Sequence, residues 1–242
     1  RRIDGEADIT LLEAGPDVSF ANCGLPYYIA GDIERRSSLL LASPQTFYDQ
    51  YRVDVHTNTE AVHIDRKGKQ VTARDTRTGR EHTYPYDKLI LAQGGKPLVP
   101  PLPGVEHEHV FQLWTLGDMD AIEDFIGSSR PKSAVVVGGG YIGLEAVEAL
   151  AKRGIHVQLV EMLPHVMPRL EGELAGFLQK ELEDYGVELH LGTSLSEIRE
   201  ESVLLGNGKT LDADFVLLSI GVKPTLKLAE EAGLELGEAG GL

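Results

Sequence analysis

The chain has little of three things that would place it in other classes of protein. It has one cysteine in 242 residues, which excludes an internal disulfide framework and suits a reducing cytoplasm. No apolar run approaches the ~18 residues of a membrane-spanning helix, and no signal peptide is visible. Lysine and arginine number 23 against 38 aspartates and glutamates. The resulting net charge of −15 makes the chain a poor partner for nucleic acid or an anionic membrane.

Glycine, by contrast, is abundant, and one glycine-rich stretch is the most informative in the chain. Residues 134–137 are small or branched apolar residues typical of a buried strand. Gly138, Gly140 and Gly143 follow with the spacing G-x-G-x-x-G, and residues 144–153 are predicted to form a helix. In a dinucleotide-binding motif, these glycines permit a tight turn, admit the pyrophosphate and let the helix pack on the strand. The start of the helix then presents unpaired N–H groups to the phosphates.

A second strand and an acidic residue complete this pattern. Ile155–Val160 is predicted as a strand, and Glu161 follows it at the distance typical of the acid that binds a ribose 2′-hydroxyl. A carboxylate at this place repels a 2′-phosphate, so we expect NADH rather than NADPH. The alternative is a glycine-rich turn without a ligand, followed by an acidic residue that only ends a strand.

The beginning of the chain repeats the second half of the same pattern. Ala7–Leu12 is predicted as a short strand that ends at Glu13, but no glycine turn precedes it. We interpret this region as a second dinucleotide-binding unit without its first strand, with Glu13 as its ribose acid. The alternative is an ordinary strand end. Because the chain also stops soon after a helix-like segment, we expect it to be a piece of a longer protein.

The single cysteine lies shortly after Glu13. Cys23 is followed by Gly24 and by Pro26, a residue suited to the first turn of a helix. Sulfur at a helix N-terminus is stabilised as the thiolate, which is the nucleophilic form. An isolated cysteine among apolar neighbours is otherwise more often packing material. The position of Cys23, after a candidate cofactor acid and at a helix start, favours a redox role.

The segments after Cys23 predict an antiparallel meander inserted in a parallel fold. A helix and four strands are expected at residues 44–51, 53–57, 60–65, 70–75 and 81–86. The histidines of this region lack metal-ligand spacing, so no metal site is expected at His56, His63 or His82. Residues 86–92 are predicted as a buried strand that leads into Gln93 and Gly94.

The second half of the chain repeats this order of elements. After a proline-rich linker we expect helices at 115–126 and 173–185 and strands at 187–191, 195–199, 202–205 and 212–221. The predicted fold is therefore α/β, with two nucleotide-binding domains of three layers (ββα), each a parallel sheet with an antiparallel meander. The predicted domains are 1–109, 110–222 and, as the start of a return to the first domain, 223–242.

Together these motifs resemble the pyridine nucleotide-disulfide oxidoreductase superfamily, whose members carry FAD on one Rossmann-like domain and NAD(P)H on the other. The run Ser19–Tyr28, SFANCGLPYY, resembles the branch that uses a single cysteine. That branch contains coenzyme A-disulfide reductases, NADH oxidases and peroxidases, and NADH-dependent persulfide reductases. The resemblance extends over essentially all 242 residues. Family members are longer and continue into a second FAD segment and a dimerisation domain.

The resemblance implies roles for individual residues. Cys23 corresponds to the redox cysteine beside the flavin, and Tyr141 to the residue that covers the flavin until nicotinamide displaces it. The residues expected at the FAD site are Glu13, Val62, Ala92, Gln93 and Gly94. Those expected at the NADH site are Gly138, Gly140, Tyr141, Ile142, Gly143, Glu145, Glu161 and Gly221. Those expected to hold coenzyme A are Arg2, Ser19 and Asn22, whereas Tyr51 stands where that site has a lysine.

The resemblance also implies an activity. It is the flavin- and NADH-dependent reduction of a low-molecular-weight disulfide or persulfide through Cys23, with coenzyme A disulfide favoured. One alternative is an NADH oxidase or peroxidase that uses a cysteine sulfenic acid. Another is that this sequence alone is a non-catalytic NADH-binding module. A reactive cysteine is compatible with each of four electron acceptors, which are coenzyme A disulfide, a persulfide, a peroxide and oxygen. At full length we expect a cytoplasmic homodimer.

Overall fold

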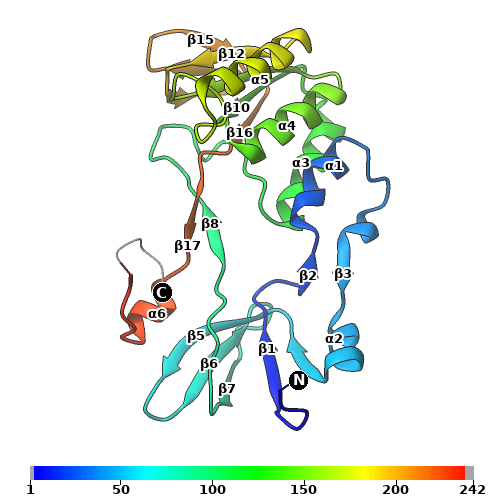
Figure 1. The fold of residues 1–242 in the computed structure, drawn as a ribbon, viewed down its shortest axis with the longest axis vertical. Helices are drawn as coiled ribbons and strands as arrows, with labels where there is room; N and C mark the ends of the chain where they lie inside the picture. Colours follow the sequence, from blue (N-terminus) through cyan, green and yellow to red (C-terminus); the bar gives the residue numbers. More distant parts are fainter. Residues whose placement is uncertain (1–2, 238–242) are drawn as a thin grey trace. The chain divides into compact units, whose positions relative to one another are not determined.

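The computed structural model describes residues 3–237, and these residues form two compact units. Unit 1 contains residues 3–21, 37–95 and 224–237, and unit 2 contains residues 22–36 and 96–223. Each unit has strands and helices of its own (Figure 1), so the predicted α/β class is confirmed. None of the helices within residues 3–237 has the length and apolar character that crossing a membrane requires.

Unit 2 is built on a five-stranded parallel sheet with the strand order β12-β11-β10-β16-β9. Its strands are β9 (Val110–Phe111), β10 (Ser133–Val137), β11 (His156–Glu161), β12 (Glu188–Leu191) and β16 (Phe215–Leu218). The central strand β10 is buried on both faces, which explains its unbroken apolar sequence.

Helices cover one face of this sheet and a meander covers the other. The helices are α1 (Leu25–Ile29), α3 (Leu116–Ser129) and α4 (Tyr141–Lys152). The meander consists of β13 (Leu195–Ile198), β14 (Ser202–Leu205) and β15 (Thr210–Asp212). Because side chains alternate along a strand, Val135 and Val137 pack with the meander, while Phe215 and Leu217 lie under the helices. This is the three-layer arrangement predicted from the sequence.

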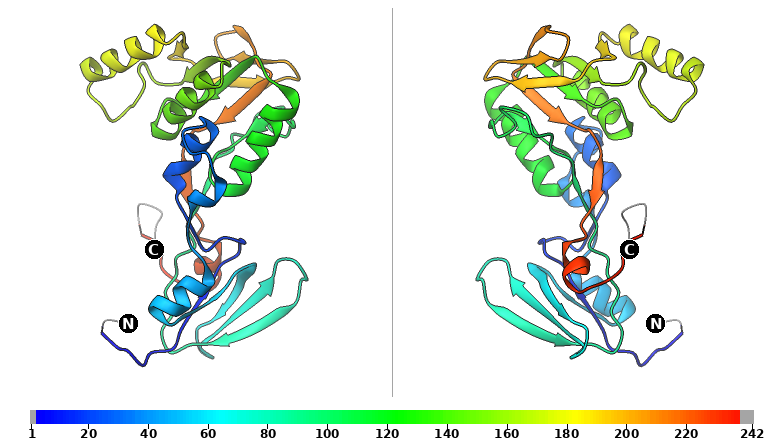
Figure 2. Two further views of the ribbon diagram at one scale, coloured as in Figure 1. Left: turned by 90° about the vertical axis from the view of Figure 1, so that its right-hand side faces the viewer. Right: turned by 90° about the vertical axis from the view of Figure 1, so that its left-hand side faces the viewer.

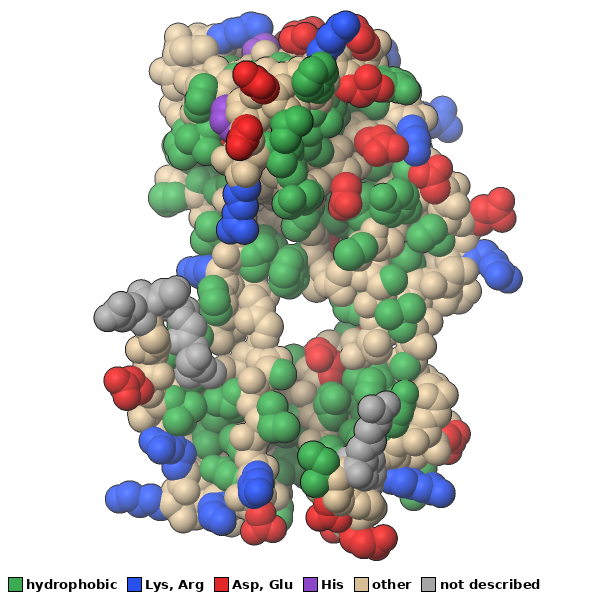
Figure 3. Space-filling model, viewed as in Figure 1, with side chains coloured by type: hydrophobic (Ala, Val, Ile, Leu, Met, Phe, Trp, Pro, Cys, Tyr) green, Lys and Arg blue, Asp and Glu red, His purple; other side chains and the backbone are tan. Residues whose placement is uncertain are grey.

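The surface of unit 2 is partly apolar and strongly acidic. Helix α5 (Gly172–Asp184) lies at the edge of the unit (Figure 2) and buries Ala175, whereas Leu174 and Phe177 are exposed. Acidic side chains are frequent over α3 and α4 (Figure 3).

Unit 1 combines small sheets with short helices. Strand β1 (Ile9–Leu12) pairs in parallel with β4 (Val53–His56), and β2 (Ser19–Phe20) pairs antiparallel with β3 (Leu40–Ala42). The predicted meander is confirmed as β5 (Thr59–Asp65), β6 (Gln70–Asp75) and β7 (Glu81–Pro85). The helices are α2 (Pro44–Tyr51) and α6 (Lys227–Glu231). The remaining elements of the chain are η1 (Asn22–Gly24), η2 (Arg36–Leu39), β8 (Gly95–Pro97) and β17 (Val222–Pro224).

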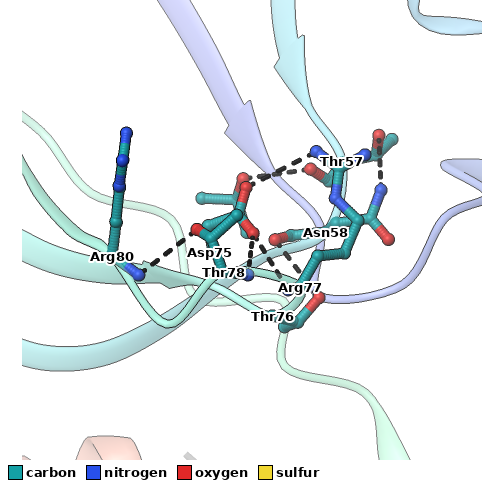
Figure 4. Close-up of polar contacts among 8 residues, drawn as sticks. Thr57, Asn58, Asp75, Thr76, Arg77, Thr78 and Arg80 are labelled. Atoms are coloured by element: carbon teal, nitrogen blue, oxygen red, sulfur yellow. Dashed lines mark hydrogen bonds and ion pairs between the residues drawn. The ribbon is translucent and has the colours of Figure 1, made fainter.

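Asp75 holds the turn between β6 and β7 (Figure 4). Its Oδ1 atom accepts hydrogen bonds from the N–H groups of Arg77 at 2.9 Å and Thr78 at 2.8 Å. The N–H of Thr78 lowers the pKa of Asp75, outweighing desolvation, and Arg77 adds to this effect. The N–H of Thr76 donates to the carbonyl of Asn58 at 2.8 Å, which ties the turn to the loop after β4.

The strand predicted at residues 86–92 is not formed, so this prediction is wrong. Residues 86–94 have no regular structure, and Ile90 is 88% exposed. In the described part of the chain, β1 and β4 form a two-stranded sheet, and residues 86–92 pair with neither strand. An apolar run becomes a buried strand only where neighbouring strands satisfy its amide and carbonyl groups. Ala92, Gln93 and Gly94 therefore follow a loop here, not a strand end.

Candidate functional site

The glycine turn between β10 and α4 admits only glycine at two of its positions. Gly138 has φ of +106°, in the left-handed region, and a Cβ there would overlap the backbone oxygen of Ser219. A Cβ on Gly143 would overlap the backbone oxygen of Gly138, because α4 packs directly on the turn. At Gly140, no described atom beyond its chain neighbours and its own helix lies within 4 Å of the place of a Cβ. Gly138 and Gly143 thus shape the turn, while Gly140 leaves open space beside the start of α4.

Helix α4 begins without a side-chain cap. Its N-cap is Gly140, which has no oxygen to offer the amides of the first turn. Helices α2 and α3, in contrast, begin with capping boxes formed by Ser43 with Thr46 and by Thr115 with Asp118. No N-cap side chain therefore covers the first-turn amides of α4 or the positive end of its dipole. Together with the open space at Gly140, this arrangement fits the pyrophosphate of a dinucleotide.

Glu161 lies directly against the glycine turn, as its spacing predicts. Its side chain is buried, and Oε2 accepts the N–H of Gly139 at 2.6 Å while Oε1 accepts the N–H of Leu163 at 2.8 Å. The N–H of Met167 donates to the carbonyl of Gly139 at 2.7 Å, so the loop after β11 is also fastened to the turn. A carboxylate has further lone pairs beyond these two hydrogen bonds. Glu161 can therefore also accept a ribose hydroxyl at this place.

The other residues predicted for the NADH site lie around the same edge of the sheet. Tyr141 is 68% exposed and is the first residue of α4, so the helix begins earlier than residue 144, where the sequence predicted its start. Ile142 is half-buried. Gly221 follows the end of β16 and has φ of +117°. Because β16 lies beside β10 in parallel, Gly221 and the glycine turn share the carboxyl edge where such sheets bind ligands.

Glu145, one turn into α4, has a raised pKa. Burial and then the nearby Glu148 disfavour its ionised form. The folded state thus binds this proton more tightly than the unfolded state, so ionised Glu145 weakens the fold above its folded-state pKa. This penalty disappears as the pH falls below the unfolded-state pKa.

Replacing Glu145 with glutamine should therefore raise the melting temperature at pH 8 by about 1–2 °C and leave it unchanged near pH 4. The measurement is scanning calorimetry at both pH values. Glu173→Gln, in the first turn of α5, is the matched control. An equal rise at both pH values would contradict the proposed cause.

Residues predicted for the FAD site lie in unit 1. Glu13 follows β1, and its Oε1 accepts the N–H of Gly15 at 2.7 Å. The N–H of Thr59 donates to the backbone oxygen of Glu13 at 2.8 Å, which places the start of β5 beside the end of β1. Val62 lies within β5, at an irregularity in its pairing with β6. The structure thus brings the strands of Glu13 and Val62 side by side.

Gln93 is the residue in unit 1 whose hydrogen bonding best fits a bound group. Its Oε1 atom is buried and has no hydrogen-bond partner among residues 3–237. Leaving a buried acceptor without a donor costs about 1–3 kcal/mol, which a donor on a ligand would remove. The neighbouring Ala92 and Gly94 are exposed, and Gly94 has φ of +65°. These three residues therefore fit the edge of a cofactor site, despite the absence of the predicted strand before them.

Cys23 is exposed and lies in the turn η1, directly before α1. Pro26 occupies the first turn of α1, as the sequence predicts. A packing role requires burial and does not fit the exposure of this thiol. Asn22 beside it is also exposed, and Ser19 is half-buried in β2. Arg2, the third residue predicted to hold coenzyme A, lies outside the described residues.

Sequence reasoning missed the residues that hold the cysteine segment. Residues 22–36 belong to the same compact unit as residues 96–223, whereas the chain on either side of them belongs to the other unit. Arg36 binds Asp120, which is 84 positions away, and Arg153 binds the backbone oxygen of Ile29, which is 124 positions away. No spacing rule links partners so far apart in one sequence. The assignment of residues 1–109 to FAD, 110–222 to NADH and 223–242 to a return segment concerns ligands, and it stays a prediction.

Comparison with known proteins identifies relatives over the whole chain. Residues 1–242 match the family described as pyridine nucleotide-disulphide oxidoreductase. An NADH oxidase of Methanocaldococcus jannaschii is 32% identical over 243 residues, covering 98% of this chain and 54% of that protein. A coenzyme A disulfide reductase of Staphylococcus aureus is 31% identical over 240 residues, covering 99% of this chain and 54% of that protein.

A solved structure agrees with these relatives. The crystal structure of reduced Bacillus anthracis CoADR-RHD is 39% identical, with a TM-score of 0.96, and the match covers 99% of this chain and 43% of that one. The chain spans about half the length of the curated relatives that it matches, 54% of each. A family match over the entire chain, together with two relatives above 30% identity, shows the relationship. The chain belongs to the pyridine nucleotide-disulphide oxidoreductase family.

Proposed function

We propose that the protein containing this chain uses FAD and NADH to reduce a low-molecular-weight disulfide or persulfide, with coenzyme A disulfide as the favoured substrate. The observation that carries the proposal is the exposed thiol of Cys23, in a chain that also has a dinucleotide-type glycine turn. A relative named coenzyme A disulfide reductase supports the substrate class. We further propose a cytoplasmic homodimer at full length.

The proposed mechanism assigns separate tasks to the described residues. The start of α4 binds the pyrophosphate of NADH, and Glu161 accepts hydrogen bonds from the ribose hydroxyls. Gln93 would accept a hydrogen bond from a bound FAD, and FAD reduced by NADH would supply two electrons to the sulfur of Cys23.

The sulfur chemistry takes place on Cys23. The Cys23 thiolate attacks one sulfur of the substrate disulfide, the substrate S–S bond breaks, and one thiolate leaves. The other half of the substrate remains as a mixed disulfide with Cys23. Two electrons and one proton then break this mixed disulfide, release the second thiol and restore the Cys23 thiolate. With a persulfide the same attack releases sulfide first.

The stoichiometry of the full-length protein tests the proposal. Under anaerobic conditions, oxidation of one NADH with coenzyme A disulfide should release two thiols. Oxidation of one NADH with a persulfide should release one thiol and one sulfide. The measurement combines NADH absorbance with thiol and sulfide titration. NADH oxidation that takes place only when oxygen is admitted would contradict a disulfide or persulfide substrate.

The relative named NADH oxidase favours a second candidate function. In that case the Cys23 thiolate attacks one oxygen of a peroxide, the O–O bond breaks, hydroxide leaves and the sulfur becomes a sulfenic acid. Two electrons and one proton then return it to the thiolate and release water. Labelling of Cys23 by dimedone during aerobic turnover would support this candidate. Unlabelled Cys23 during rapid oxygen consumption would exclude it.

The choice of nicotinamide cofactor provides a further prediction. Because the carboxylate of Glu161 repels a 2′-phosphate, NADH should bind more tightly than NADPH. Glu161→Gln removes the charge and should reduce the ratio of the two affinities by about tenfold, or about 1.4 kcal/mol. Titration of both nucleotides measures the ratio, with Glu171→Gln in the same loop as control. The ratio of the two affinities is the readout because Glu161 also accepts hydrogen bonds from the N–H groups of Gly139 and Leu163. Disturbing those bonds affects both nucleotides alike, whereas the lost charge affects their ratio. An unchanged ratio would exclude Glu161 as the ribose acid.

A further inference from the structure

Helix α1, in the segment that carries Cys23, lies beside α3 and α4 (Figure 1). Leu25 and Ile29 of α1 are buried. Ile29 lines a small cavity together with Ile122 of α3 and Leu150 of α4. Helix α1 has five residues, and a helix this short is not stable by itself in water. The position of the segment therefore depends on further contacts with unit 2.

Arg153, at the end of α4, provides one of these contacts. Its Nη1 atom donates to the backbone oxygen of Ile29 and to Oε1 of Glu123, both at 2.8 Å. The carbonyl of Ile29 belongs to the last turn of α1, where carbonyls have no partner within the helix. The side chains of Arg153 and Glu123 are 30% and 26% exposed, so solvent screens this pair only in part. One guanidinium thus joins α1, α3 and α4.

Arg36, the last residue of the segment, provides a second contact. Its Nε and Nη2 atoms donate to the two carboxylate oxygens of Asp120, each at 2.8 Å. This two-point geometry is more specific than a single ion pair. Lys152 adds a hydrogen bond to Asp32 at 2.9 Å, and Asp32 and then Glu148 raise the pKa of Lys152. The Lys152 pair is more exposed than the Arg153 pair and contributes less.

We propose that Arg153 and Arg36 are positioning residues for Cys23. We call their contacts, Arg153 with Ile29 and Glu123 and Arg36 with Asp120, the guanidinium clamp. The clamp holds the segment that follows Cys23 at Ile29 and at Arg36, and it fixes the segment to α4 and α3. The inference rests on the proposed function, because it assumes that Cys23 reacts with the substrate.

The location of the clamp separates its effect from nucleotide binding. Helix α4 has the glycine turn at its first end and Arg153 at its last, about 18 Å apart for a helix of 12 residues. Loss of the clamp should therefore loosen the cysteine segment and leave the nucleotide end of α4 intact. A residue that only stabilised unit 2 as a whole would affect both ends.

The test uses Arg153→Met and Arg36→Met in the full-length protein, with Arg199→Met as the matched control. Arg199 makes an ion pair with Glu197 at 2.9 Å elsewhere in unit 2. Hydrogen exchange at the amides of residues 30–33, which bond to carbonyls in α1, should accelerate about tenfold in both clamp variants. Exchange in β10 and β11 should stay unchanged. The kcat for coenzyme A disulfide should fall about tenfold, while the Kd for NADH stays within about twofold.

Each outcome of this test supports or overturns the clamp. Exchange at residues 30–33 equal to that of Arg199→Met would overturn it, as would an NADH Kd that rises in step with the fall in kcat. Should one variant fail to fold, the exchange result of the other decides. If the unmodified protein shows no disulfide turnover, the proposed function fails, whereas hydrogen exchange still decides whether the clamp holds the segment.

Discussion

Replacing Cys23 with serine should lower the reduction of coenzyme A disulfide by the full-length protein by about a thousandfold or more. The expected effect is this large because the mechanism forms its covalent intermediate on this sulfur, and loss of a nucleophile removes that route entirely. A serine hydroxyl is far less acidic than a thiol and does not exchange with disulfides. The measurement is anaerobic NADH oxidation with the disulfide as acceptor.

The same substitution should leave the fold and the nucleotide site intact. Cys23 is exposed, and exposed substitutions usually change stability by no more than about 0.5 kcal/mol. The Kd for NADH, measured by titration, should therefore match that of the unmodified protein. Asn22→Ala, next to Cys23 and also exposed, controls for disturbance of the turn η1 in the NADH titration alone, because Asn22 is itself expected to hold coenzyme A. Turnover by Cys23→Ser above one tenth of the original rate would exclude the thiol as the reacting group.

Several elements in both units could be predicted from local sequence, because their causes are local. The apolar residues 134–137 form β10, and the proximity of Glu161 to the glycine turn follows from the spacing of one strand–helix–strand unit. Ser43 and Pro44 predicted the start of α2, and the structure confirms its bounds. In each case the determining residues lie within about 30 positions of one another.

The failures have a common physical cause, which is dependence on distant partners. Residues 86–92 have the composition of a buried strand, yet composition does not show whether a neighbouring strand is present to pair with them. The attachment of Cys23 to unit 2 depends on Arg153, whose acceptor on Ile29 lies 124 positions earlier in the chain. A single sequence carries no spacing signal for such a contact. The geometry of the glycine turn and Glu161 was therefore accessible from the sequence, and the placement of the cysteine segment was not.

The glycine turn allows stability and nucleotide binding to be separated by two neighbouring substitutions. Gly138→Ala should destabilise unit 2 by about 3 kcal/mol, a drop of roughly 10 °C in melting temperature. Two causes add here. The φ of +106° is strained for alanine, and the new methyl group overlaps the backbone oxygen of Ser219, so β10 or β16 must shift.

Gly140→Ala should behave in the opposite way. Its φ of −84° suits alanine, and no described atom beyond its chain neighbours and its own helix lies within 4 Å of the new methyl group. Stability should fall by less than about 1 kcal/mol, the difference between glycine and alanine at an N-cap. The methyl group would nevertheless fill the space through which a pyrophosphate reaches the amides of α4, so the NADH Kd should rise at least about tenfold.

Calorimetry and NADH titration on both variants provide the comparison. Gly172→Ala, at the first residue of α5, introduces the same methyl group where it also meets no described atom within 4 Å, and it should change neither quantity by more than a small amount. If Gly140→Ala binds NADH as tightly as the unmodified protein, the pyrophosphate does not lie at this turn. The proposed transfer of electrons from nicotinamide to Cys23 would then have no NADH site in this chain. The contacts of Glu161 would in that case serve only to pack the loop after β11.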